Sequence, residues 1–198
     1  RDVLGSRGLG DVYKRQDTDY FHITLNVPKT DIFSCQKTIF ATNIHKHTMA
    51  GIYIHIPFCK TRCIYCDFYS TTRSELKQQY IRALCTELKT RKGYLKEEPI
   101  ETIYFGGGTP SQLAHEDFEQ IFRTIKEVYG TEHAEEITLE ANPDDLTEEY
   151  VSMLRTLPFN RISMGIQTFD APTLKLLNRR HNAAQAIAAI HLSLIHIS

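Results

Sequence analysis

The chain has 198 residues, of which 41% are hydrophobic and 24% charged, and its formal net charge is −1. These values are typical of a soluble globular protein and exclude a disordered or collagen-like chain. A charge so close to zero argues against a protein that coats nucleic acid. No apolar run reaches the roughly eighteen residues that a membrane-spanning helix needs, so at most peripheral membrane contact is expected.

Three segments are predicted along the chain. Met49 is the first methionine and directly precedes a strand-like stretch, so it is predicted to be the natural start, and residues 1–48 to be a non-native leader with little structure. Residues 191–198 are predicted to be a read-through tail. Residues 49–190 then form one domain, which ends within a helical pattern and is therefore predicted to be cut short.

Strands and helices alternate along residues 49–190. Gly51–Pro57 has the period-2 pattern of a strand, and a loop follows. Thr72 and Glu75 predict a capping box before an amphipathic helix over Ser74–Arg91. The later predictions are a strand over Glu101–Phe105 ended by three glycines, a helix over Leu113–Tyr129 capped by Gly130, a strand over Glu136–Ala141, a helix over Thr147–Leu157, a strand over Arg161–Gln167, a helix capped by Asp170, and a helix over Ala183–Ile190. This order predicts an α/β fold with a parallel sheet.

Unusual residues follow each predicted strand. The first strand leads into three cysteines and the second into Gly106–Pro110, while Glu140 and Gln167 end the third and fourth. Because active sites in parallel α/β folds lie at the carboxyl ends of the strands, these residues are expected at one edge of the sheet.

Cys59, Cys63 and Cys66 have C-x3-C-x2-C spacing with no fourth cysteine nearby. Three thiolates on one loop can hold three irons of a [4Fe–4S] cluster and leave the fourth iron open to a ligand. The alternative is a structural zinc site with His55 or Asp67 as the fourth ligand.

The other two cysteines take no part in this motif. Cys85 is predicted to be a core thiol, and Cys35 carries no argument. The odd total of five cysteines and the lack of an export signal predict reduced thiols in the cytoplasm.

The remaining candidates each have a structural alternative. Three glycines let the backbone approach a ligand closely, or simply form a turn. Glu140 suits paired ribose hydroxyls, or forms a salt bridge or cap. Gln167 offers a donor and an acceptor, or is a satisfied buried amide. Arg179, Arg180 and His181 are ambiguous, since basic residues near a helix boundary usually form a solvated face.

These motifs together resemble one enzyme family. The stretch from Tyr53 to Cys66, then GGGTP, LEANP, SMGIQTF and NRRH, resembles the radical S-adenosylmethionine (SAM) enzymes, and more narrowly the oxygen-independent coproporphyrinogen oxidase-like group. The resemblance covers nearly all of residues 49–190. It implies a partial (β/α) barrel of radical SAM type, truncated here after about four βα units. The missing units predict an exposed sheet edge and aggregation.

The resemblance also implies the cofactors and their ligands. Cys59, Cys63 and Cys66 would bind a [4Fe–4S] cluster, whose open iron takes the amino and carboxylate groups of SAM. The residues implied for the SAM pocket are Tyr53, Tyr65, Gly107, Gly108, Thr109, Glu140, Gln167 and Arg179.

The resemblance leaves two branches of this group as alternatives, the coproporphyrinogen III oxidases and the heme chaperones. Phe68 stands where the coproporphyrinogen III oxidases have a further cysteine, and Met49 lies only ten residues before Cys59. Both features favour the heme-chaperone branch over the decarboxylating enzyme. The resemblance implies heme or a porphyrin as ligand, an electron donor such as flavodoxin or ferredoxin, and heme-receiving respiratory proteins as partners. A zinc-stabilised interaction domain is the remote alternative.

Overall fold

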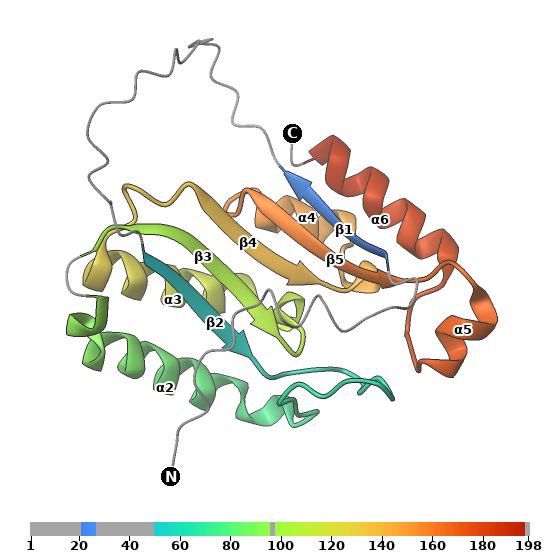
Figure 1. The fold of residues 1–198 in the computed structure, drawn as a ribbon, viewed down its shortest axis with the longest axis horizontal. Helices are drawn as coiled ribbons and strands as arrows, with labels where there is room; N and C mark the ends of the chain where they lie inside the picture. The colour runs from blue at the N-terminus through green and yellow to red at the C-terminus, as the bar shows by residue number, and fades with distance from the viewer. Residues whose placement is uncertain (1–20, 27–49, 96–97, 197–198) are drawn as a thin grey trace, which may run out of the picture.

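The computed structural model describes residues 21–26, 50–95 and 98–196, with side chains from residue 50 to residue 193 within these ranges. Its central feature is a five-stranded sheet in the order β1-β5-β4-β3-β2 (Figure 1). The strands are β1 (Phe21–Asn26), β2 (Ala50–Ile56), β3 (Ile100–Gly107), β4 (Glu136–Ala141) and β5 (Arg161–Gln167). Strands β2 to β5 are mutually parallel, so the predicted parallel α/β fold is confirmed.

The predicted leader contributes β1 to this sheet. β1 runs antiparallel to β5, with Leu25 opposite Ile162, and therefore lies along the edge that the sequence predicted to be exposed. The rest of residues 1–48, including Cys35, lies outside the described residues, and the origin of this segment stays a prediction.

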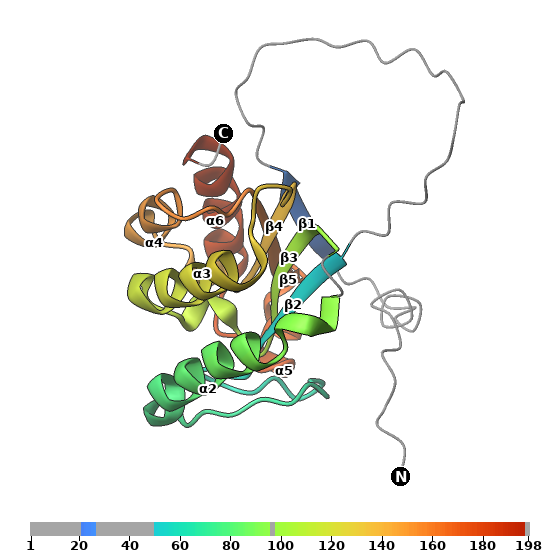
Figure 2. The ribbon, with the colours of Figure 1, turned by 90° about the vertical axis from the view of Figure 1, so that its left-hand side faces the viewer.

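The helices cover one face of the sheet (Figure 2). They are α2 (Lys77–Thr90), α3 (His115–Tyr129), α4 (Glu148–Leu154) and α6 (Ala183–His196), while the short α5 (Ala171–Leu176) lies near the carboxyl ends of the strands. α6 continues through most of the predicted tail. No helix in the described part of the chain has the length and apolarity that crossing a membrane would require.

Alternation along the strands separates the core from a polar face. Ile54 and Ile56 of β2 are buried on the helix side, whereas Tyr53 and His55 are partly exposed. On the helix side Phe105 of β3 packs against three other aromatic rings, Phe118, Phe122 and Phe159, at centroid distances of 5.7, 5.2 and 5.3 Å. We call the other side the open face; its strand residues include Tyr53, His55, Tyr104, Glu140 and Gln167.

The start of the first helix differs from its prediction. A 3-10 turn over Ser74–Leu76 precedes α2, and no side chain caps it. The Ser74 amide donates to the backbone carbonyl of Thr72 at 2.9 Å, so the Thr72 hydroxyl forms no capping box. The Glu75 carboxylate instead pairs with Arg73 at 3.0 Å.

The other elements lie close to their predicted bounds. β3 extends through the first two glycines, beyond its predicted end at Phe105. Gly130 closes α3 with φ 73° and the Asp170 carboxylate caps α5, as predicted. The Thr147 hydroxyl caps α4, which ends at Leu154 and not at the predicted Leu157, and α6 continues beyond its predicted end at Ile190. The buried Cys85 lies on the core side of α2, as predicted for a core thiol.

Candidate functional site

The carboxyl ends of β2 to β5 meet around an open cavity, the position at which parallel α/β folds bind their ligands. Every predicted site residue except Tyr53 lines it: Cys59, Cys63, Tyr65, Cys66, Gly107, Gly108, Thr109, Glu140, Gln167 and Arg179. The topology brings these residues together because four parallel strands end at the same edge.

The cysteine loop is closed at its base by backbone hydrogen bonds. The Cys59 amide donates to the Thr71 carbonyl at 2.9 Å, and the Thr71 amide donates to Pro57 at 2.7 Å. His55 fixes the far arm of the loop, because its Nε2 donates to the Tyr69 carbonyl at 2.8 Å. The loop therefore leaves and rejoins the sheet at one place, with its three thiols between the two arms.

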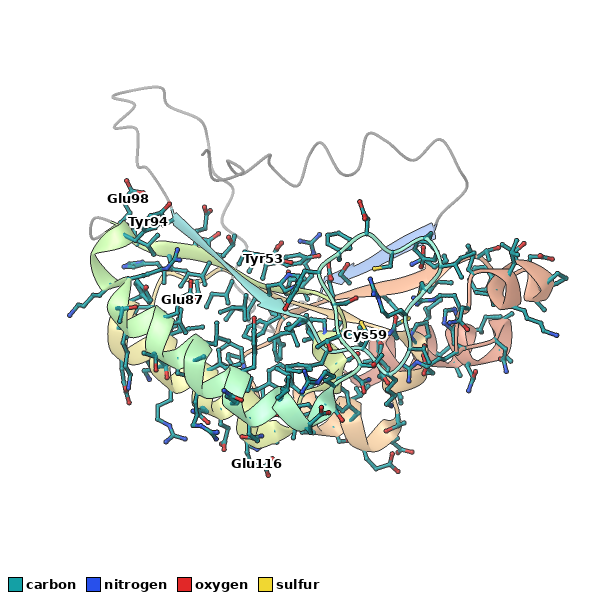
Figure 3. All side chains as sticks on the ribbon, turned by 90° about the horizontal axis from the view of Figure 1, so that it is seen from below. Tyr53, Cys59, Glu87, Tyr94, Glu98 and Glu116 are labelled. Atoms are coloured by element: carbon teal, nitrogen blue, oxygen red, sulfur yellow. The ribbon has the colours of Figure 1, made fainter. Side chains whose placement is uncertain are left out.

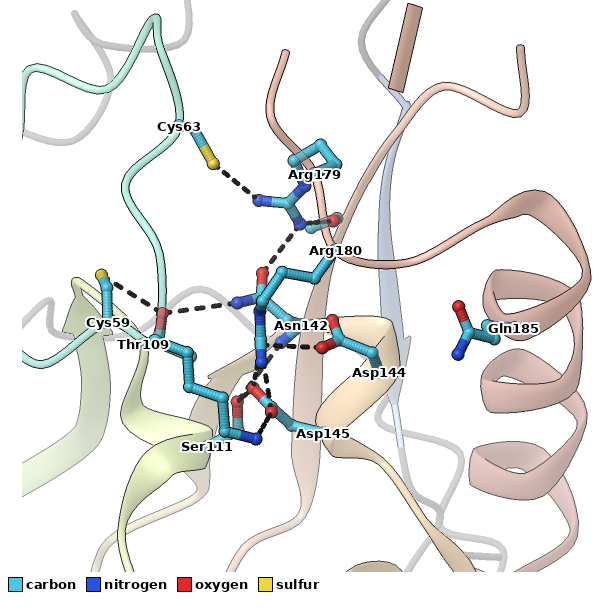
Figure 4. A network of polar contacts seen from close by, with 12 residues as sticks. Cys59, Cys63, Thr109, Ser111, Asn142, Asp144, Asp145, Arg179, Arg180 and Gln185 are labelled. Carbon is cyan, nitrogen blue, oxygen red and sulfur yellow. Dashed lines mark hydrogen bonds and ion pairs between the residues drawn. The ribbon is translucent and has the colours of Figure 1, made fainter. Parts of the chain in front are cut away.

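Two of the cysteine sulfurs accept hydrogen bonds from the opposite wall of the cavity (Figure 4). Thr109 Oγ1 donates to Cys59 Sγ at 3.4 Å, and Arg179 Nη1 donates to Cys63 Sγ at 3.4 Å. Burial raises the pKa of the Cys59 thiol, and the Thr109 hydrogen bond opposes that rise. The donors favour thiolate sulfur, the form in which cysteine binds metal.

Asn142 connects these two donors. Its Nδ2 donates to Thr109 Oγ1 at 3.4 Å, and its Oδ1 accepts from Arg179 Nη2 at 2.7 Å. A continuous chain of side-chain hydrogen bonds thus runs from Cys59 through Thr109, Asn142 and Arg179 to Cys63.

Glu140 is oriented by two donors on the neighbouring strand. The Tyr104 hydroxyl donates to Oε1 at 2.7 Å, and the Gly107 amide donates to Oε2 at 3.1 Å. A carboxylate oxygen accepts more than one hydrogen bond, so Glu140 keeps acceptor capacity for a ligand hydroxyl.

Two backbone positions at the cavity lie in the left-handed region of φ. Gly107 has φ 111°, and Gln167, a residue with a side chain, has φ 68°. Such a conformation costs a non-glycine residue about 1–2 kcal/mol, and these outliers cluster at ligand sites. The Gln167 backbone is therefore a feature of the site that no sequence pattern indicated.

The two predicted tyrosines lie in different places. Tyr65 lines the cavity, and burial raises its pKa well above the usual range. Tyr53 does not line it: its side chain is 47% exposed on the open face, with its ring 6.1 Å from that of Tyr104 (Figure 3). Tyr53 lies two residues before His55 on β2, and its hydroxyl contacts His55 Nδ1 at 3.1 Å. Burial, followed by the Glu140 charge, raises the pKa of Tyr53 to about 12.

The solvated-face interpretation is wrong for the basic residues after α5. The side chain of Arg180 is only 20% exposed and pairs with Asp144 at 2.9 Å and Asp145 at 3.1 Å. His181 is buried and donates from Nε2 to the Ile166 carbonyl at 3.0 Å. Arg179, as described, reaches the cysteine loop.

The chemistry of the donor set suits a [4Fe–4S] cluster. Three free thiols on one loop can each bind a different iron, whereas a structural zinc site takes four protein ligands. Both ring nitrogens of His55 already have partners, so His55 is not free to serve as a zinc ligand.

Sequence reasoning missed several residues of the site. Asn142 lines the cavity, and Ser111 and Asp145 contact lining residues. None of the three was assigned, although each follows a strand within two to five residues of a predicted site residue. Tyr104 was also missed, and its signal was its period-2 relation to Gly106 and the other open-face residues. Nothing in the sequence marked which polar side chains would contact one another.

Comparisons with known proteins identify the family of the chain. The model of the Radical SAM superfamily matches residues 53–194. The chain is 38% identical to the heme chaperone HemW of Buchnera aphidicola (subsp. Schizaphis graminum) over 142 residues, covering 71% of this chain and 38% of that protein. It is 39% identical to HemW of Lactococcus lactis over 139 residues, covering 70% of this chain and 36% of the relative.

A solved structure shows the same arrangement of strands and helices. Coproporphyrinogen III oxidase (HemN) from Escherichia coli, described as a radical SAM enzyme, superposes with a TM-score of 0.67 and 29% sequence identity. The match covers 74% of this chain and 34% of that structure. The chain thus spans little more than a third of the length of the relatives it matches.

Proposed function

Because the chain belongs to the radical SAM superfamily, which implies a [4Fe–4S] cluster and SAM as cofactors, we propose that both are held in the cavity at the carboxyl ends of β2 to β5. Cys59, Cys63 and Cys66 would each hold one iron of the cluster, which would leave the fourth iron open to a ligand. One observation carries this assignment: the three free thiols and the polar ends of three further strands open onto the same cavity.

The rest of the cavity is suited to SAM. Glu140, already oriented by Tyr104 and the Gly107 amide, accepts from the ribose hydroxyls. Gly107, Gly108 and Thr109 meet the methionine end, and Gln167 and Arg179 complete the pocket. When bound, the reduced cluster supplies the electron that cleaves the SAM sulfonium. The protein's own contribution is to orient the cofactors and keep positive hydrogen-bond donors beside the thiolates.

Metal content tests this assignment. The 198-residue chain is reconstituted anaerobically beside Cys63→Ala, with Cys85→Ala as the matched control on the core side of α2. We expect about four irons and four sulfides per chain in the wild type and in Cys85→Ala, and a large loss in Cys63→Ala. Zinc without sulfide would refute the cluster.

For the longer protein we propose heme chaperoning, with heme as the ligand and respiratory proteins as recipients. The support is the identity of 38–39% with heme chaperones across this region and the half-exposed Phe68, where the decarboxylating enzymes have a cysteine. Oxidation of coproporphyrinogen III is the second candidate, because the HemN structure shares the fold. A flavodoxin or ferredoxin as electron donor and a cytoplasmic location also remain proposals.

Two assays on the protein extended to the length of its relatives separate these candidates. A heme chaperone binds hemin stoichiometrically in a spectroscopic titration and forms no protoporphyrinogen IX from coproporphyrinogen III. Decarboxylation with SAM and a reductant would instead establish the enzyme.

A further inference from the structure

Asp145 is the most enclosed charge beside the cavity. It ends the 3-10 turn Pro143–Asp145 after β4, and its side chain is only 2% exposed. A carboxylate buried to this extent requires charged or hydrogen-bonding partners to offset its loss of hydration. The proposed cofactor chemistry gives this residue no role.

Its partners come from the three neighbouring strand ends. Lys60 Nζ, in the cysteine loop after β2, contacts Oδ1 at 3.0 Å. Ser111 Oγ, after β3, donates to Oδ2 at 2.9 Å. Arg180 Nη2, which follows β5 and α5, contacts both oxygens at 3.1 Å (Figure 4).

Each partner is adjacent in sequence to the site. Lys60 directly follows Cys59, and Arg180 directly follows Arg179, whose guanidinium reaches Cys63. Ser111 also accepts from the Asn142 amide at 3.3 Å. One buried carboxylate therefore joins all four segments that carry the site.

We propose that Asp145 is a positioning residue that holds the cysteine loop against the cavity wall through Lys60 and Arg180. This inference rests on the proposed cluster site, and it accounts for the positioning of a loop whose side chains Ile64, Phe68 and Tyr69 are exposed and add little packing. Preorganised ligands of this kind depend on supporting contacts from a second layer of residues.

The test measures thiol reactivity in the metal-free 198-residue chain. Iodoacetamide is added to wild type, Asp145→Asn, Lys60→Gln and Lys60→Arg, and alkylation of each cysteine is followed by peptide mass spectrometry. Cys85, buried in the core, reports opening of the whole domain. Glu136→Gln is the matched control, because Glu136 pairs with Arg161 at the opposite end of β4 and β5.

The two disruptive variants separate geometry from charge. Removing the negative charge of Asp145 makes nearby thiols more reactive by electrostatics alone, whereas removing the positive charge of Lys60 makes them less reactive. Loss of loop positioning raises reactivity in both. We expect Asp145→Asn and Lys60→Gln each to speed alkylation of Cys59 roughly fivefold relative to Cys85, with Lys60→Arg and Glu136→Gln near wild type.

Two results would overturn the proposal. One is a Cys59 rate in Lys60→Gln that is unchanged or lower than in wild type. The other is an equal rise at Cys59 and Cys85 in Asp145→Asn, which indicates general destabilisation. Because the chain is metal-free, this outcome is independent of whether iron is taken up, so the cluster assignment and the positioning role can fail separately.

Discussion

The hydroxyl of Tyr104 lies 2.7 Å from Oε1 of Glu140 and donates to it across the β3–β4 pair. Since the Gly107 amide holds the other oxygen, the carboxylate is fixed in orientation before any ligand arrives. For the proposed ribose ligand, fewer conformations of the Glu140 side chain would remain to be lost on binding, so the entropic cost of binding would be smaller.

Tyr104→Phe is therefore expected to weaken SAM binding. Losing one hydrogen bond to a charged acceptor costs about 1–2 kcal/mol, which corresponds to a rise in dissociation constant of roughly tenfold. Equilibrium dialysis of the reconstituted protein measures it, with Tyr94→Phe as control because Tyr94 is 76% exposed. Equal affinities in the two variants would show that the Tyr104 hydroxyl does not orient Glu140.

Gly108→Ala is expected to destabilise the fold. A Cβ at Gly108 would lie 2.8 Å from the backbone oxygens of Ile56 and Pro57, which cannot move aside without shifting β2. We expect the free energy of unfolding in urea to fall by about 1–3 kcal/mol. Gly93→Ala meets nothing within 4 Å and serves as the control; a similar loss in both variants would contradict the clash.

The helix caps give a paired prediction. Thr147 caps α4 by accepting from the Tyr150 amide at 3.2 Å, so Thr147→Ala is expected to cost about 1 kcal/mol of stability. Thr72→Ala is expected to cost little, because no side chain caps the 3-10 turn that precedes α2. Thermal unfolding of both variants measures the difference. A larger loss of stability in Thr72→Ala than in Thr147→Ala would show that the Thr72 hydroxyl does cap the helix, as the sequence predicts.

His181 is expected to make stability depend on pH. Burial, aided by the Arg179 charge, lowers its pKa from the usual 6.5. Above pH 6.5 both folded and unfolded states hold a neutral ring, so His181 has no effect there. Below that pH the unfolded state binds the proton first, and stability is lost until the pH reaches the lowered folded pKa.

The measurement is the unfolding midpoint between pH 7.5 and pH 5 for the wild type, His181→Gln and His133→Gln. Removing the buried imidazole is expected to flatten the acid side of the profile relative to the exposed His133 control. An unchanged acid slope in His181→Gln would rule out this residue as the cause.

Strong periodic patterns predicted most of the fold. β4 and β5 have the predicted bounds, and Gly130 and Asp170 act as predicted, because local backbone preferences decide strand alternation and helix ends. The predicted capping box before α2 is absent because the chain forms a 3-10 turn there. In this turn the Ser74 amide donates to the Thr72 carbonyl and not to the Thr72 hydroxyl.

The sequence predicted where the candidate site lies, but not which of its side chains contact one another. Strand ends identified the cavity, since that depends only on topology. The partners of Asp145, namely Lys60, Ser111 and Arg180, lie 85, 34 and 35 residues from it along the chain. No local sequence pattern reports such distant pairs. Arg180 stayed ambiguous in the sequence for the same reason, because its burial depends on ion pairs with the turn after β4.

Strands β2 to β5 have a helix side and an open face, so residues that pack in the core alternate along each strand with residues that face the open side. Ile54 and Ile56 belong to the first set, and Tyr53 and His55 to the second. Thr138 and Ser163 on the open face are themselves buried, so they belong with the core positions. A library confined to exposed open-face positions such as Tyr53 would vary the polar surface while leaving the helix-side packing of Ile54 and Ile56 in place.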